Sequence, residues 1–236
     1  MGKTEQKKKG EGMDSAGEVF MKIYTDEQIR DIYKRIDERE EDNEDAWGHH
    51  NFNHVSNVKN LVVEILKKLN ANEELIEEAK RAAIMHDVGA VQGKQNHAYR
   101  SYEFAKNYFE CNNIKLKDND LILEAIKNHS DGFDTDNIIQ SALILADKLD
   151  IKNTRPTKNG LNVPGNRQYK NIEDIHVDIE DNTLKIKFEA NDELNKEELD
   201  NFYFMQKVSN SIKSFAKKFD LNHEVYLNND IWKELL

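Results

Sequence analysis

The hydrophobic periodicity of the chain changes once, near residue 170, and this change constrains the fold more than any other feature. Before it, apolar residues recur at three- and four-residue steps, as they do from Val55 to Leu69, which is the spacing of an amphipathic helix. After it, Ile175, Val177 and Ile179 alternate with polar residues, which is typical of a strand. The pattern therefore predicts a helical domain followed by a small unit that contains strands.

The helical part divides into six predicted helices. Thr25 and Gln28 suggest a capping box at the start of the first, and the acidic run to Asp45 suggests that this helix is solvated. The next four are expected over residues 54–69, 72–87, 96–109 and from 118 onward, with Gly89 just past the end of the second of these. The sixth, 138–149, is nearly all apolar, as a buried central helix would be.

Residues 171–236 predict a β-β-α-β appendage. Alternating segments on both sides of Asp181 and Asn182 indicate a hairpin. A long amphipathic helix over 195–219 and a third strand over 223–227 complete it. Residues 1–20 hold four of the ten glycines and a lysine run, and we expect a flexible leader there. The fold class is thus mainly α, with a helical bundle over 21–170 and a small α+β appendage.

Composition excludes several classes of function. The 236 residues carry 34 basic and 45 acidic side chains, a net charge of −11, so the surface repels nucleic-acid phosphates. No apolar run approaches the roughly 18 residues that span a bilayer. The single cysteine, Cys111, forms no internal disulfide, which fits a reducing cytoplasm. We therefore expect a cytoplasmic protein with no nucleic-acid or membrane partner, and a homodimer through the appendage stays open.

Histidines and aspartates mark the ends of the predicted helices. His54 and His97 lie near helix starts, and His86 and His129 lie near helix ends. Asp87 follows His86 directly, and Asp147 lies in the most apolar helix, where a carboxylate is costly unless a cation neutralises it. Imidazole and carboxylate together suit a transition metal. Taken singly, such histidines are more often partners of a helix dipole, and such aspartates more often hydrogen-bonded structural groups.

The order and context of these residues resemble the HD-domain superfamily of metal-dependent phosphohydrolases. The resemblance rests on His54-Val-Ser-Asn-Val58, Met85-His86-Asp87-Val88-Gly89 and Leu145-Ala-Asp147-Lys-Leu-Asp150, and it covers about residues 50–155. It implies that His54, His86, Asp87 and Asp147 hold one metal. His97 and His129 match the subset with a second metal, which Asp87 would bridge to the first.

The resemblance also implies a reaction and a cofactor. The reaction is hydrolysis of a phosphate ester or anhydride, with a nucleotide as the expected substrate, by water that the metal activates. The cofactor is one or two divalent transition-metal ions, iron foremost, with manganese, cobalt, nickel or zinc as alternatives. The span from Ala125 to Arg155 looks most like bacterial HD hydrolases of dinucleoside polyphosphates.

One position departs from the pattern of several HD families. They place a lysine three residues after the aspartate of the His-Asp doublet, where this chain has Ala90, although Lys94 follows four residues later. The departure counts against a cyclic-dinucleotide phosphodiesterase and against an HD-type di-iron oxygenase. The oxygenase nevertheless stays an alternative, as does a sensor that binds a nucleotide without turnover.

Basic residues without acidic neighbours suggest where a phosphate would bind. The segment 151–170 carries five basic residues and no acidic one, and 88–100 likewise has no acid. From these segments and the metal-ligand helix we expect substrate contacts by cations that match phosphate oxygens: Lys94, Arg100, Lys148, Arg155 and Lys158. Ser130 is a candidate for orienting substrate, and Asp87 and His50 are candidate catalytic residues, His50 as a general acid. The alternative is a solvated loop that balances the acidic surface.

Overall fold

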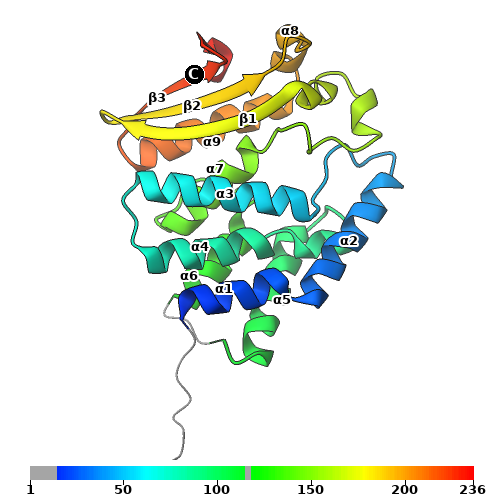
Figure 1. Ribbon diagram of the computed structural model, residues 1–236, viewed down its shortest axis with the longest axis vertical. Coiled ribbons are helices and arrows are strands. Elements are labelled where there is room, and N and C mark those ends of the chain that lie inside the picture. Colours follow the sequence, from blue (N-terminus) through cyan, green and yellow to red (C-terminus); the bar gives the residue numbers. More distant parts are fainter. Residues whose placement is uncertain (1–14, 115–117) are drawn as a thin grey trace, which may run out of the picture.

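The computed structural model describes residues 15–114 and 118–236 (Figure 1). The predicted leader lies outside the described residues up to residue 14. The remaining residues of the predicted leader, 16–20, are helical instead of flexible. They belong to α1 (Ala16–Thr25), which begins with a capping box between Ser15 and Glu18. Val19 and Phe20 are buried in the core. The apolar residues of this segment therefore find a packing partner that the composition of residues 1–20 does not suggest.

The predicted helices are present with small shifts at their ends. They are α2 (Glu27–Glu41), α3 (Phe52–Lys68), α4 (Glu73–Met85), α5 (His97–Cys111), α6 (Asn119–Asn128) and α7 (Ile138–Leu149). A short 3-10 helix, η1 (Val88–Gln92), joins α4 to α5. Gly89 lies inside η1 rather than at a helix end, and a Cβ there would come within 2.3 Å of the His97 carbonyl oxygen. The glycine thus allows the start of α5 to approach the end of α4.

Two predictions about α2 were wrong. The cap is Asp26 rather than Thr25, since the Asp26 carboxylate accepts from the N–H groups of Gln28 and Ile29. The helix is also not solvated all round. Its apolar residues form one buried stripe that includes Tyr33, and the acidic residues that dominate its composition occupy mainly the other faces.

The appendage contains a four-stranded mixed sheet. Its elements are β1 (Ile172–Glu180), β2 (Thr183–Ala190), α8 (Lys196–Asp200), α9 (Phe204–Lys218), β3 (Asn222–Leu227), β4 (Asp230–Ile231) and η4 (Lys233–Leu235). The strand order is β1-β2-β3-β4, with only the β2–β3 pair parallel. Asp181 and Asn182 both have positive φ, as the predicted two-residue hairpin turn requires. The predicted helix over 195–219 is instead two helices, because residues 201–203 form a turn.

The appendage packs directly on the helical domain. In Figure 1 the sheet lies at one end of the molecule, with α9 beside it and α3 and α7 below. Strand β1 contacts α3, and α9 contacts α7, so one continuous hydrophobic core runs through both parts. Every residue of α7 from Ile139 to Leu149 is buried, as predicted for a central helix. No helix in the described ranges is long and apolar enough to span a bilayer.

The basic loop after α7 is held against the segment before α3. The His49 N–H donates to the Arg155 carbonyl at 2.8 Å, and the Thr157 N–H donates to the Trp47 carbonyl at 3.2 Å. The Asn166 side-chain amide donates to the same Trp47 carbonyl at 2.8 Å. Two short helices, η2 (Gly160–Asn162) and η3 (Asn166–Asn171), shape the rest of the loop. The loop is therefore a fixed wall rather than a free cover.

Gly160 tests this attachment. A Cβ at Gly160 would lie 2.0 Å from the Trp47 carbonyl oxygen, so we expect Gly160→Ala to force the loop away from Trp47 and to lower the free energy of unfolding by about 1–3 kcal/mol. Gly17→Ala is the matched control. A Cβ at Gly17 meets only the Glu77 side chain, at 3.9 Å, and alanine favours helix α1 by up to about 1 kcal/mol. Thermal unfolding of both variants measures the difference, and equal melting temperatures would contradict the attachment.

Candidate metal centre

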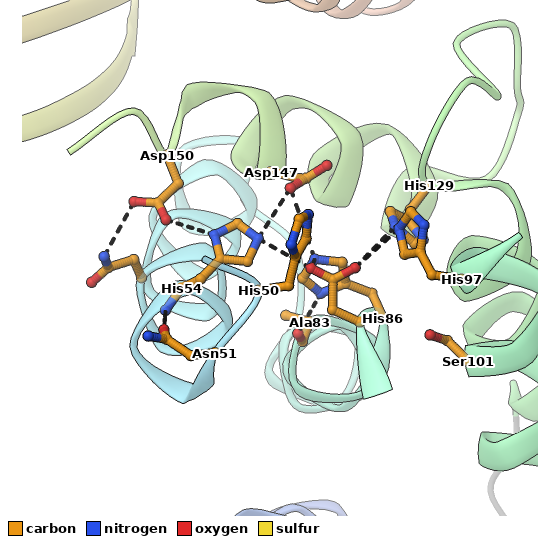
Figure 2. Close-up of polar contacts among 12 residues, drawn as sticks. His50, Asn51, His54, Ala83, His86, His97, Ser101, His129, Asp147 and Asp150 are labelled. Carbon is orange, nitrogen blue, oxygen red and sulfur yellow. Dashed lines mark hydrogen bonds and ion pairs between the residues drawn. The ribbon is translucent and has the colours of Figure 1, made fainter. Parts of the chain in front are cut away.

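The predicted ligands converge on Asp87, although they come from five different helices or their ends. His54 lies in the first turn of α3, and His86 is the C-cap of α4, directly before Asp87. His97 opens α5, His129 is the C-cap of α6, and Asp147 lies in the last turn of α7. Figure 2 shows the histidine rings turned toward one common centre. The structure thus brings all six predicted ligands together.

The two carboxylate oxygens of Asp87 face different histidines. Asp87 Oδ2 lies 3.3 Å from His54 Nε2 and 3.2 Å from His86 Nε2. Asp87 Oδ1 lies 3.1 Å from His97 Nε2 and 3.5 Å from His129 Nε2. Asp87 therefore stands between two groups of ring nitrogens, as a carboxylate that bridges two cations would.

Asp147 belongs to the first of these groups. Its Oδ1 lies 3.2 Å from His54 Nε2 and 3.8 Å from His86 Nε2. Its Oδ2 accepts from Lys148 Nζ at 2.6 Å. Lys148 thus fixes the orientation of the Asp147 carboxylate and leaves the other oxygen free to face the histidines.

Hydrogen bonds on the far side of each ring fix its orientation. His86, His97 and His129 each place Nδ1 at 2.7–2.8 Å from the backbone carbonyl three residues earlier. His54 places Nδ1 at 2.7 Å from the Asp150 carboxylate (Figure 2). Because a carbonyl only accepts, Nδ1 carries the proton and the Nε2 lone pair points to the centre. This is how proteins orient histidines that bind metals.

The inner atoms of the centre lack partners of opposite polarity. His54 Nε2, His86 Nε2 and both Asp87 oxygens are buried without a hydrogen-bond partner among the described residues. Lone pairs that face one another without protons repel, and a buried polar atom left unpaired is costly. A cation removes both penalties, and nitrogen and carboxylate oxygen donors together suit a transition metal.

The described ranges contain three overlapping groups of candidate ligands. They are His54, His86 and Asp87; His86, His129 and Asp147; and Asp87, His97 and His129, each with donor atoms within 4.8 Å of one another. The donor chemistry and spacing therefore fit one or two metal ions, and this donor set does not single out one metal.

Without a metal, protons take the place of the cation. Burial and the charge of Arg155 lower the pKa of His54, but the neighbouring carboxylates of Asp147, Asp150 and Asp87 outweigh them and raise the pKa to about 10. Burial likewise lowers the pKa of His86, and the Asp87 and Asp147 carboxylates raise it to about 9. Against the opposing effect of burial, the histidines hold the pKa of Asp87 well below its usual range. The charge of Lys148, together with His54 and His86, does the same for the pKa of Asp147. Metal binding must therefore release protons.

His50 lies beside the centre, with its ring centroid 5.9 Å from those of His54 and His97. Its Nδ1 is 2.5 Å from Glu40 Oε1. Burial, together with the charge of Arg155, lowers the pKa of His50 to about 4. The ring is then neutral at neutral pH, with Nε2 as a proton acceptor. The predicted role of His50 as a general acid needs a protonated ring, and it stays a prediction.

A cleft of about 640 Å³ opens onto the centre. The predicted residues Lys94, Ser130, Lys148 and Arg155 line it, as do His50 and four of the six predicted ligands. Lys127 and Lys207 also line it, and sequence analysis missed both. Desolvation, with the charges of Arg155 and Lys207, lowers the pKa of Lys94. These cations lie close enough to repel one another, which favours an anion between them.

Two predicted substrate residues lie elsewhere. The Arg100 guanidinium donates to the carbonyls of Gly89 at 2.9 Å, of Gln95 at 2.6 Å and of Gly93. Arg100 therefore holds the η1 loop and does not line the cleft, because its donors are used by backbone groups that lack helical partners. Lys158 is exposed on the loop and lines neither the cleft nor the neighbouring cavity.

Three further residues of the centre and cleft were not predicted from the sequence: Asp150, Glu40 and Lys207. Asp150 stands three residues after Asp147 in the quoted motif, so a second carboxylate at this helix end was a usable signal. Glu40, which fixes His50, lies within a run of acidic residues that gives no mark of its own. Lys207 is one of several lysines on α9, and only the packing of α9 on α7 brings it to the cleft.

Comparison with known proteins agrees with this geometry. Residues 51–152 match the family model described as the HD domain, and this range contains all six predicted ligands. This part of the chain is an HD domain with buried His/Asp clusters, and HD domains are typically metal-dependent phosphohydrolases. No curated protein matches the chain.

The raised histidine pKa values predict a pH dependence of stability in metal-free protein. Because the folded pKa values of about 10 and 9 exceed the usual 6.5, the stabilisation is complete below pH 6.5 and is lost as pH rises through 9 to 10. The melting temperature of chelator-treated protein should fall over this range, and less so in His54→Gln. His176→Gln, at an exposed histidine of β1, is the control. An equal fall in His54→Gln and wild type would contradict the assignment.

The two faces of Asp87 predict the metal content. Wild type should bind two ions per chain, and His97→Ala should bind one, since His54, His86, Asp87 and Asp147 remain. Elemental analysis of protein purified in excess metal measures this. His176→Ala should retain two ions. A wild-type content of one ion would show that the His97 side of Asp87 holds no metal.

Proposed function

We propose that the chain is a metal-dependent phosphohydrolase that uses water to cleave a phosphate ester or anhydride of a nucleotide. The observation that carries the proposal is the position of Asp87, whose two oxygens face separate histidine groups at the base of a cationic cleft. A site with metal ligands on one side and cations on the other suits a phosphate whose negative charge increases on attack.

The residues divide between holding metal and holding substrate. His54, His86, Asp87 and Asp147 would hold one ion, and Asp87, His97 and His129 a second. Bound divalent ions supply a coordinated water of lowered pKa and neutralise charge on the phosphoryl group. Asp150 and Lys148 keep ligands His54 and Asp147 in position, as outer partners of metal ligands do.

The cleft residues bind and orient the phosphate. Arg155 offers a forked guanidinium, whereas Lys94 and Lys207 act as point charges. His50, held by Glu40, has its Nε2 free to accept a proton from water or from the substrate. On a chain with net charge −11, this group of cations favours an anionic substrate in this cleft over other faces.

A nucleotide with more than one phosphate is the substrate we favour. Besides Lys148, which is paired with Asp147, the described residues Lys94, Lys127, Arg155 and Lys207 border one cleft, and this is more positive charge than a single phosphate requires. Hydrolysis of a dinucleoside polyphosphate, which the resemblance of residues 125–155 suggests, is consistent with that charge. Several HD families have a lysine at the position of Ala90, which is buried here. Lys94 lines the cleft and would supply the cation that this alanine lacks.

A phosphate-release screen over mono-, di- and dinucleotides, with iron, manganese and cobalt, tests the proposal. Wild type should release phosphate only with metal. Asp87→Ala should lose more than the 10- to 100-fold that is typical of losing an outer partner of a metal site, because both ions lose a ligand. His176→Ala is the control and should keep full activity.

The other outcomes distinguish the alternatives. Turnover that persists in metal-loaded Asp87→Ala would overturn the proposed mechanism. Oxygen consumption by reduced protein, without phosphate release, would indicate an HD-type oxygenase. Tight nucleotide binding without any turnover would indicate a sensor.

A further inference from the structure

A second cavity of about 290 Å³ adjoins the cleft. Arg155, His50, Lys94 and Phe204 line both spaces, so the two are continuous at these residues. The cavity differs from the cleft in chemistry, because aromatic side chains form much of its wall: Trp47, Tyr169, Phe202, Tyr203 and Phe204.

The aromatic wall is assembled from three separate segments. Trp47 precedes α3 and Tyr169 belongs to η3, whereas Phe202 and Tyr203 lie in the turn between α8 and α9 and Phe204 opens α9. The Trp47 and Tyr203 rings lie 6.3 Å apart between centroids, at 67°. Both rings are exposed, Trp47 by 37% and Tyr203 by 58%. Large aromatic rings left exposed beside a cavity are typical of a binding site.

Tyr169 gives a second, independent sign of a ligand. Its side chain is 97% buried against solvent, since only 3% is exposed. Its hydroxyl is buried and has no hydrogen-bond partner among the described residues. Arg155 Nη1, where the cavity meets the cleft, is also buried and unpartnered within the described part of the chain. Such atoms are costly unless a bound molecule satisfies them.

We propose that this cavity binds the nucleoside part of the substrate. The base packs against Trp47 and Tyr203, a polar group of the nucleoside meets the Tyr169 hydroxyl, and Arg155 holds the phosphate where cavity and cleft join. The turn between α8 and α9 is then a specificity-determining element that the appendage adds to the HD domain. The phosphate part of this assignment rests on the proposed function, whereas binding of the base does not.

The size and chemistry of the two spaces support this division. The cavity volume of 290 Å³ lies at the lower limit of small-molecule sites, which occupy roughly 300–1,000 Å³, and therefore suits a nucleoside better than a nucleotide with several phosphates. The larger cleft carries four of the predicted metal ligands, together with Lys127, Lys148 and Lys207, which do not line the smaller cavity. Every nucleic-acid base can stack on an aromatic side chain through its π-face, whichever base it is. The aromatic wall offers such faces.

Trp47 provides a direct measurement that does not depend on turnover. The chain has two tryptophans, and Trp232 is fully buried and packs on Phe188 at 5.2 Å. With tryptophan-selective excitation, adenosine, guanosine, cytidine or uridine should therefore quench Trp47 fluorescence in metal-loaded protein. Ribose 5-phosphate, which lacks a base, should not. Trp47→Phe should abolish the quenching.

Two variants locate the base. Tyr203→Ala should weaken nucleoside binding about tenfold or more, the effect of losing one stacked ring. Tyr226→Ala, on β3 of the same appendage and outside the cavity lining, is the matched control and should bind normally. Tyr169→Phe should weaken binding several-fold while its melting temperature stays equal or rises, because the hydroxyl it removes has no partner. If Tyr203→Ala fails to fold, nucleoside binding by Tyr169→Phe tests the proposal instead.

The outcomes separate this proposal from the proposed function. No quenching by any nucleoside, or quenching that survives both Tyr203→Ala and Tyr169→Phe, would overturn the nucleoside site even if nucleotides release phosphate. Quenching that both variants weaken, in protein that releases no phosphate, would leave the nucleoside site standing and overturn the hydrolase.

Discussion

The burial of one carboxylate among histidine nitrogens is the constraint on which the rest of the structure depends. Asp87 is 1% exposed, and both of its oxygens face ring nitrogens rather than N–H donors of the backbone. A carboxylate in such a place is stable only with positive charge beside it. The helix termini that carry these histidines therefore have to lie where the rings reach Asp87. These are the N-termini of α3 and α5 and the C-termini of α4 and α6.

The helix ends meet this requirement in a shared way. At His86 and His129 a carbonyl of the last turn, which no helical N–H satisfies, accepts from the ring instead. One hydrogen bond thus caps the helix and also points Nε2 inward. Gly89 completes the arrangement, since a side chain there would push the start of α5, and with it His97, away from Asp87. The rigidity of the centre comes from backbone groups that need partners in any case.

The sequence predicted the parts of this arrangement that depend on local pattern. Helix α7 was predicted at its observed ends because its sequence is nearly all apolar, and the hairpin at Asp181 because two strands alternate around a two-residue turn. The break between α8 and α9 was missed because residues 201–203 keep the apolar spacing of a helix. Arg100 was assigned to phosphate because composition shows its charge but not the carbonyls that use it. Lys207 was missed because only tertiary packing carries it to the cleft.

The same packing gives the two parts of the chain different roles. Helix α7 bears Asp147 and Lys148 beside the centre and packs on α9, while α9 brings Lys207 and Phe204 to the cleft. A substitution in the α8–α9 turn therefore alters the wall of the aromatic cavity without touching a candidate metal ligand. Under the proposed function, the chemistry of the HD domain stays constant while the appendage sets which molecule reaches it. Because α7 packs on α9, residues of both parts of the chain line the same cleft.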